Sequence, residues 1–365
     1  MGLQQVNATT TTNRNTAAKN PTKKKRNTKA PRKSRLTFPN IDLKTQLEYA
    51  RNGHGVLRNF INENKDQGKP EPSSNNVKLM NLRKDIVDLA KDEELKAWVQ
   101  KVQVAAGIQK HERDLVEACR SIEGCQKALQ DMGVVASLPF LQYFNTWRKI
   151  QAVKDLAYEL GEAASVLLDV PTVRLYQDAV FWKRSRDGPT PWHADARMAP
   201  FDTQHMITFW IPLQGVPSPQ DGGTALCFCS KSHSDFALPY WNPLEGKSAD
   251  PKDENYRSAW DRLEDRYPRK VVDYMPMSLG DVTVHSGWTL HYSNGNEMKG
   301  SKDRLALAIS FVDGDAEIRP NWETIGDDED RWSYQEWCRD VRPQTQFSHP
   351  LVPIVWPPSQ RDIAK

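Results

Sequence analysis

Several features that mark other protein classes are absent from this sequence of 365 residues. No stretch approaches the roughly 18 consecutive apolar residues of a membrane-spanning helix, and nothing resembles the apolar centre of a secretory signal. The five cysteines are too few and too scattered for a disulfide framework, which favours a reducing compartment. We therefore expect a cytoplasmic protein that has no membrane partner.

Acidic residues are missing from the first 35 positions, which hold ten of the 50 Lys and Arg. The rest of the chain therefore carries 40 bases against 47 acids, a formal charge of −7. Because this basic arm is also poor in apolar residues, we expect residues 1–35 to be a disordered tail and residues 36–365 to form one domain. The arm is a solvated tail in the simplest interpretation. The alternatives are a nuclear-import patch around residues 21–26, a nucleic-acid-binding arm or an organelle-targeting segment.

The apolar residues make up 38% of the chain and include 12 Trp, which is sufficient for a sizeable core. Helical periodicity predicts a helix at 43–51 and a helical part over 82–168, while 53–60 is predicted as a first strand. After Pro171, short apolar runs between Gly and Pro turns predict an antiparallel sandwich or barrel with helices outside it. Its predicted strands are 173–183, 190–195, 206–211, 225–229, one that follows Gly280 and Asp281 and ends near His291, and 304–311.

The motif His-x-Asp occurs twice, at His193–Asp195 and at His233–Asp235. Side chains two residues apart in a strand point to the same face, so His193 and Asp195 would present a nitrogen and an oxygen side by side. Two His and one carboxylate on one face of the metal are the ligands of non-haem Fe(II) oxygenases. The second copy lies in a polar segment that predicts a loop. We therefore expect the first copy to bind the metal, with another His arriving from elsewhere in the fold.

In the strand predicted at 304–311, Arg304 shares one face with Ala306, Ala308 and Ser310. These small residues leave open volume beside the guanidinium, whose planar fork matches a carboxylate bidentately. The pattern indicates a site for a small dianion inside the barrel. A surface ion pair is the plainer alternative, but it does not explain why the face shared with Arg304 is made of small residues.

Over roughly residues 40–320 the chain resembles the phytanoyl-CoA dioxygenase family of Fe(II)/2-oxoglutarate oxygenases. The resemblance rests on several short runs that together are far more specific than His-x-Asp. These runs are Gly53–Phe60, Thr190–Asp195, Ile207–Leu213, Gly222–Gly223 followed by Ser230–His233, Gly280–Asp281, His291–Ser293, and Arg304.

The resemblance implies an α+β, mainly β fold: a double-stranded β-helix (jelly-roll, cupin-like) core over 171–320, flanked by N-terminal helices and followed by an extension over 321–365. It makes His291, rather than its neighbour His285, the third metal ligand beside the first His-x-Asp copy. The implied cofactors are Fe(II), 2-oxoglutarate as cosubstrate, and O2. The charged segment 240–270 is expected to lie over the mouth of the fold.

Four residues are candidates for holding 2-oxoglutarate. Arg304 and Ser293 match the family's positions for its distal carboxylate, and Trp210 matches an aromatic wall of that pocket. Lys183, on the strand before His193, is the next basic candidate for the anchor. The chain also departs from the family, since Ala194 stands where relatives often carry Gln.

The implied reaction is hydroxylation of a C–H bond in a small organic substrate, with release of succinate and CO2. A halogenase would need an open metal position in place of the carboxylate of Asp195. A nucleic-acid-acting oxygenase would use the basic arm, but the acidic body disfavours phosphate binding. A non-catalytic jelly-roll binding protein would need neither the metal ligands nor Arg304.

The basic arm should be dispensable for stability and chemistry. A variant lacking residues 1–35 is expected to keep its melting temperature and turnover, because the arm cannot bury enough apolar surface to order itself. Calorimetry and turnover assays on both proteins test this. A lower melting temperature in the shortened protein would place the domain boundary before residue 36.

Overall fold

A computed structural model describes residues 41–61, 76–107, 120–134, 140–185, 187–238, 263–268, 270–296, 303–325, 331 and 333–358. The contacts divide the chain into residues 1–35 and residues 36–365, and all of the described residues belong to the second unit. The predicted basic tail and most of the predicted excursion over 240–270 lie outside the described residues. In the described part of the chain, no helix is long and apolar enough to cross a membrane.

The larger of the two main sheets has seven antiparallel strands in the order β1-β9-β6-β11-β3-β13, and β2 also pairs with β3. Along each of these strands, successive side chains point to opposite faces of the sheet. The strands are β1 His54–Leu57, β2 Leu141–Phe144, β3 Val173–Lys183, β6 Met206–Pro212, β9 Val282–Ser286, β11 Arg304–Asp313 and β13 Ile354–Trp356.

The smaller main sheet has the order β4-β10-β7-β8, and a two-stranded sheet joins β5 to β12. Its strands are β4 Thr190–His193, β7 Leu226–Cys229, β8 Val271–Asp273 and β10 His291–Ser293, while β5 is Phe201–Asp202 and β12 is Glu317–Ile318. The main sheets face each other, because the rings of His285 on β9 and His291 on β10 lie 4.3 Å apart. This is the predicted jelly-roll arrangement, although no closed barrel forms among the described strands.

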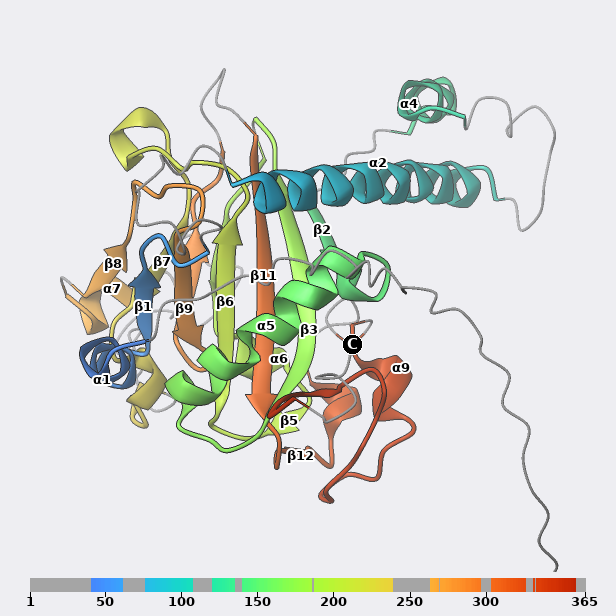
Figure 1. Ribbon diagram of the computed structural model, residues 1–365. Helices are drawn as coiled ribbons and strands as arrows, with labels where there is room; N and C mark the ends of the chain where they lie inside the picture. The colour runs from blue at the N-terminus through green and yellow to red at the C-terminus, as the bar shows by residue number, and fades with distance from the viewer. Residues whose placement is uncertain are drawn as a thin grey trace, which may run out of the picture. The chain divides into compact units, whose positions relative to one another are not determined.

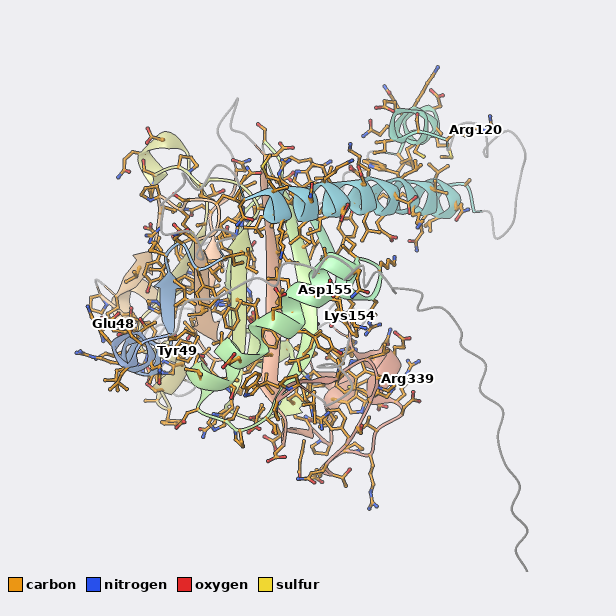
Figure 2. All side chains as sticks on the ribbon, in the orientation of Figure 1. Glu48, Tyr49, Arg120, Lys154, Asp155 and Arg339 are labelled. Carbon is orange, nitrogen blue, oxygen red and sulfur yellow. The ribbon has the colours of Figure 1, made fainter. Side chains whose placement is uncertain are left out.

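Helix α5, Gln151–Leu168, covers the outer face of the larger sheet and contacts β3, β6, β11 and β13 (Figure 1). Its buried residues recur at three- and four-residue steps, as the helical pattern predicted, while Asp155 is exposed on the outer side (Figure 2). The other helices are α1 Leu43–Asn52, α2 Val77–Ala105, α4 Ile122–Asp131, α6 Asp195–Met198, α7 Leu263–Arg266 and α9 Gln335–Cys338, with 3-10 turns η3 Thr146–Arg148, η4 Pro219–Asp221, η5 Ser232–Ser234 and η8 Trp322–Thr324.

Strand β11 separates the two environments of the fold. Its large residues, Leu305, Leu307, Ile309 and Phe311, belong to the main hydrophobic core together with the buried residues of α5. Its small residues Ala306 and Ala308 instead pack with Trp210 in a different cluster, which lies on the other face of the strand. The small-residue face therefore points into the space between the sheets, as the alternation predicted.

The structure corrects several of the predicted elements. Residues 141–144, expected to be helical, form β2, so the second helix begins only at Gln151. The single strand expected to end near His291 is two strands, β9 and β10, which lie in different sheets. The predicted first strand joins the larger sheet as β1, and β2 and β13 add unpredicted strands from outside the expected core of 171–320. Periodicity could not show these differences, since short apolar runs fit either kind of element.

Candidate metal centre

The antiparallel pairing of β4 with β10 brings His193 directly opposite His291. Asp195 does not continue β4, as the strand pattern predicted, but is the first residue of the short helix α6. Ala194 between them is nonetheless extended, with φ −134° and ψ 123°. Side chains on either side of an extended residue point the same way, so His193 and Asp195 still project together toward His291.

These three side chains form the group of potential metal ligands in the described part of the chain, with one ligand atom from each lying within 4.8 Å of the others. Asp195 Oδ1 lies 3.6 Å from His193 Nε2 and 3.5 Å from His291 Nε2. Such a cluster of two imidazole nitrogens and one carboxylate oxygen is the donor set that suits a ferrous ion.

The hydrogen bonds of the two His rings fit metal binding. His193 Nδ1 lies 2.8 Å from the Pro191 carbonyl oxygen, and His291 Nδ1 lies 3.0 Å from the Thr289 carbonyl oxygen. A carbonyl oxygen can only accept, so each Nδ1 carries the proton and each Nε2 presents a lone pair toward Asp195. The backbone therefore selects the tautomer that a metal requires.

The charge state of the cluster also fits a cation. Burial opposes ionisation of Asp195, but the nearby His291 and His285 outweigh it and hold the pKa of Asp195 below its ordinary value. Burial, and then the neighbouring His193, lower the pKa of His291 well below its ordinary value. An ionised carboxylate beside a neutral imidazole is the protonation state in which these groups ligate metals.

The remaining histidines near the centre have other partners. His285 Nε2 lies 3.2 Å from Asp195 Oδ2, and the centre of its ring lies 4.3 Å from that of His291. His54, which lies in the strand predicted over 53–60, is buried opposite His285 in the register of β1 and β9. Its ring nitrogens each lie 2.8 Å from a hydroxyl group, those of Tyr274 and Ser230.

The side chains of the second His-x-Asp copy, His233 and Asp235, make hydrogen bonds to other parts of the protein. His233 lies in the turn η5, and its Nε2 contacts the Ala50 carbonyl oxygen at 3.2 Å. Asp235 accepts two hydrogen bonds from Arg266, at 2.8 and 2.7 Å, and one from the Tyr267 hydroxyl at 2.7 Å. Its oxygens are therefore occupied by protein donors, and the two residues do not join the metal-ligand group.

Beyond the metal cluster, the same face of β10 leads to two buried cations. Ser293 follows His291 by two residues, which places it roughly 6.5 Å further along the strand. Arg304 Nη2 donates to Ser293 Oγ at 3.2 Å, and its guanidinium lies 5.4 Å from the centre of the Trp210 ring. Lys183, the cross-strand partner of Arg304, donates to the carbonyl oxygens of Ser293 and Asn294 at 3.3 and 3.1 Å. The structure thus brings all four predicted cosubstrate-binding residues together.

These cations are buried, and Asp187 is the acid whose charge acts on Lys183. Arg304 is 5% exposed and Lys183 is 0% exposed. Burial lowers the pKa of Arg304 to about 10, and burial together with the charge of Arg304 lowers the pKa of Lys183 to about 7. Arg304 Nε has no hydrogen-bond partner in the described part of the chain. Buried like charges and an orphaned donor are unfavourable unless an anion joins them, so the geometry fits an anionic ligand.

Two residues of the centre, Thr208 on β6 and Ser310 on β11, were not predicted from the sequence. Thr208 Oγ1 donates to Asp195 Oδ2 at 2.8 Å and lies 2.9 Å from Ser310 Oγ. Ser310 was recognised only as a small residue on the face of Arg304. A polar residue within the otherwise apolar run of β6 was the signal that could have identified Thr208.

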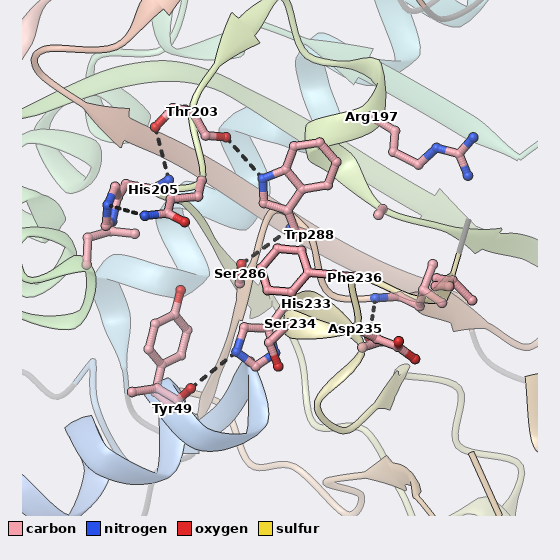
Figure 3. Close-up of a pocket in the computed structure, with 18 of the residues that line it drawn as sticks. Tyr49, Arg197, Thr203, His205, His233, Ser234, Asp235, Phe236, Ser286 and Trp288 are labelled. Carbon is pink, nitrogen blue, oxygen red and sulfur yellow. Dashed lines mark hydrogen bonds between the residues drawn. The ribbon is translucent and has the colours of Figure 1, made fainter. Parts of the chain in front are cut away.

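A cavity of about 1060 Å³ is lined by residues that include Tyr49, His233 and Trp288 (Figure 3). Trp288 and the exposed Phe236 line it together with several leucines, and Ala194 reaches it because that residue points away from the ligands on either side. None of the three potential metal ligands lines this cavity.

Two facing antiparallel sheets that hold a His-Asp-His group between them define a jelly-roll protein with a candidate metal centre. The sequence profile of the phytanoyl-CoA dioxygenase (PhyH) family matches residues 81–304, more than half of the chain. The chain therefore belongs to this family of 2-oxoglutarate-dependent oxygenases. The matched range contains the three potential metal ligands and ends at Arg304.

The fold is similar to solved structures of low sequence identity. The non-heme alpha ketoglutarate dependent epimerase SnoN from nogalamycin biosynthesis has a TM-score of 0.51 and 16% identity, covering 86% of this chain and 97% of that one. The carbocyclase SnoK from the same biosynthesis has a TM-score of 0.51 and 17% identity, covering 86% and 96%. EctD from S. alaskensis with bound Fe has a TM-score of 0.50 and 15% identity, covering 87% and 92%.

None of the curated proteins matches the sequence significantly. The structural similarities concern the fold, since all three identities are below 20%. Activity and substrate must therefore be argued from the residues of this chain.

Single substitutions at the two carboxylates distinguish the two His-x-Asp copies. Asp195→Ala should abolish binding of Fe(II), because it removes one of three ligands and the only negative charge of that group. Asp235→Ala should bind Fe(II) as the unchanged protein does, while losing some stability from the broken contacts with Arg266. Anaerobic titration with Fe(II) measures both. Retained stoichiometric binding in Asp195→Ala, with loss in Asp235→Ala, would reverse the assignment.

Proposed function

We propose that this chain is an Fe(II)- and 2-oxoglutarate-dependent dioxygenase that hydroxylates a C–H bond of a small organic substrate. The observation that carries the proposal is a metal-ligand cluster that includes His291 on β10, together with two buried cations, Arg304 and Lys183, that contact Ser293 on the same strand. His193, Asp195 and His291 would hold the iron. Family membership supports the same class of reaction.

The distance between the metal-ligand cluster and the buried cations suits 2-oxoglutarate. The step of roughly 6.5 Å from His291 to Ser293 is close to the span of a five-carbon diacid. One end of the cosubstrate would reach the iron, and its distal carboxylate would accept hydrogen bonds from Arg304 and Ser293. Trp210 would form a wall beside it, and Lys183 would add a second positive charge behind Ser293.

Bound iron would supply the oxidative chemistry: 2-oxoglutarate loses CO2, one atom of O2 enters succinate, and the other enters the product as hydroxyl. The chain's own residues orient the reactants. The backbone carbonyls of Pro191 and Thr289 fix the ligand tautomers, and the buried cations hold the cosubstrate in one direction. The small residues Ala306 and Ala308 leave volume between the sheets.

The oxidative outcome is testable once a substrate is found. SnoN and SnoK are an epimerase and a carbocyclase, so a similar fold supports different products. A screen of small metabolites for stimulated succinate release would identify the substrate, and mass spectrometry would identify the product. A gain of one oxygen atom supports hydroxylation, whereas a product without added oxygen contradicts it.

Arg304→Ala should separate binding of the cosubstrate from binding of the metal. Each hydrogen bond to a charged group contributes roughly 1.5–3 kcal/mol, so the 2-oxoglutarate Kd should rise about ten- to a hundredfold. The Fe(II) stoichiometry should be unchanged, because Arg304 is not a ligand. Arg304→Lys should recover part of the loss, since an ammonium cannot reproduce the two-pronged contact. An unchanged Kd in Arg304→Ala would refute this role.

Binding of 2-oxoglutarate should weaken as pH rises above about 7, the pKa to which burial and the charge of Arg304 lower Lys183. A dianion favours the charged ammonium, so binding above this pH requires proton uptake and becomes progressively less favourable. Lys183→Met should flatten the dependence of Kd on pH between 7 and 9. Calorimetric titration in buffers of different ionisation heat measures both the Kd and the protons taken up. A flat profile in the unchanged protein would contradict this role.

A further inference from the structure

The second oxygen of the Asp195 carboxylate is held from the opposite sheet. Oδ2 accepts a hydrogen bond from Thr208 Oγ1 at 2.8 Å and lies 3.2 Å from His285 Nε2. Oδ1 instead lies near the Nε2 atoms of the two ligand histidines, at 3.6 and 3.5 Å. The two oxygens of one carboxylate therefore have different surroundings, one facing protein donors and the other facing the metal cluster.

The proton positions in this network follow from the chemistry of its members. Thr208 has a single hydroxyl hydrogen, which must go to the ionised carboxylate, because a carboxylate can only accept. Ser310, 2.9 Å from Thr208 Oγ1, must then be the donor of that contact. His285 likewise donates from Nε2, because the carboxylate oxygen can only accept. Its Nδ1 is buried and has no hydrogen-bond partner in the described part of the chain.

The network is built on adjacent strands of the larger sheet. Thr208 on β6 pairs in register with His285 on β9 and with Ser310 on β11. All three residues are buried, at 3%, 1% and 5% exposure. A row of cross-strand neighbours in the middle of a sheet has little freedom to move, so its donors are fixed before any metal arrives.

We infer that Thr208 and His285 are positioning residues that hold Oδ2 of Asp195 and leave Oδ1 as the single carboxylate oxygen for the metal. This inference rests on the proposed function. A second carboxylate oxygen on the metal would close one of the open positions that the cosubstrate and O2 need. Hydrogen bonds to a ligating carboxylate also fix its orientation, which raises metal affinity.

Metal affinity tests the inference without reference to turnover. Mn(II) serves as a redox-stable probe, and the electron paramagnetic resonance signal of the free ion gives its Kd. Thr208→Val replaces the hydroxyl by a methyl group of similar size and should weaken Mn(II) binding about 10- to 100-fold. Thr208→Ser keeps the donor and should bind Mn(II) as the unchanged protein does. His285→Leu removes the other donor and should weaken binding by a similar factor.

Thr283→Val is the matched control. Thr283 is buried on β9, pairs with Trp210 on β6, and its Oγ1 has no hydrogen-bond partner among the described residues. It should therefore leave the Mn(II) Kd unchanged, although it makes the same chemical substitution in a neighbouring strand. Melting of the metal-free variants by circular dichroism shows which of them fold. If Thr208→Val does not fold, His285→Leu and Thr208→Ser carry the test.

Three outcomes decide the matter. Weakened binding in Thr208→Val or His285→Leu, with Thr208→Ser and Thr283→Val unchanged, supports the inference. Equal Mn(II) affinity in the unchanged protein and in the folded donor-deficient variants overturns it, while leaving the proposed function intact. Failure of the unchanged protein to bind either Mn(II) or Fe(II) overturns the proposed function and this inference together.

Discussion

The carboxylate of Asp195 is the point at which the two main sheets depend on each other. Its Oδ1 faces histidines of the smaller sheet, and its Oδ2 faces Thr208 and His285 of the larger one. A partly buried negative charge is costly unless donors or cations surround it, so this position constrains residues on four strands at once. A metal ion would complete the set by bringing positive charge to the carboxylate.

Two buried positive charges lie beside the next part of β10. Arg304 and Lys183 place two buried cations beside Ser293, and each makes the charge of the other less favourable. Such an arrangement lowers the stability of the ligand-free protein and favours the binding of an anion. With a metal ion bound, the cluster and the cation pair would together form a site that is positive at both ends, which would suit a dianion spanning them.

The sequence predicted which residues form the ligand cluster, but it did not predict the secondary structure around them correctly. His193 and Asp195 were expected to share a strand, but Asp195 begins α6, and only the extended Ala194 preserves their common direction. Alternation along β11 predicted correctly which residues face the core and which face the interior, because that strand is long and has a strong contrast in side-chain size. The division of the segment before His291 between two sheets was missed, since a tight turn between apolar runs has no distinct periodicity.

Other parts of the site depend on pairing between distant strands. Thr208, His285 and Ser310 form one row only because β9, β6 and β11 are neighbours in a particular register. A single-residue shift in any of these pairings would send the side chain to the opposite face. Local patterns in one sequence do not specify such a register. The spacing of residues in the sequence therefore could not predict the donors to Asp195. It could predict Arg304 and its small neighbours, because they lie on a single strand.

Coupling between the two ends of the site tests most directly whether they form one continuous site. If metal and 2-oxoglutarate occupy such a site together, each must strengthen binding of the other. Anaerobic calorimetric titration of 2-oxoglutarate into the protein, with and without saturating Fe(II), measures this coupling. We predict a Kd at least about tenfold lower with Fe(II), corresponding to roughly 1.4 kcal/mol of coupling. Equal affinity in the two titrations, or no binding in either, would contradict a shared site for the metal and the cosubstrate.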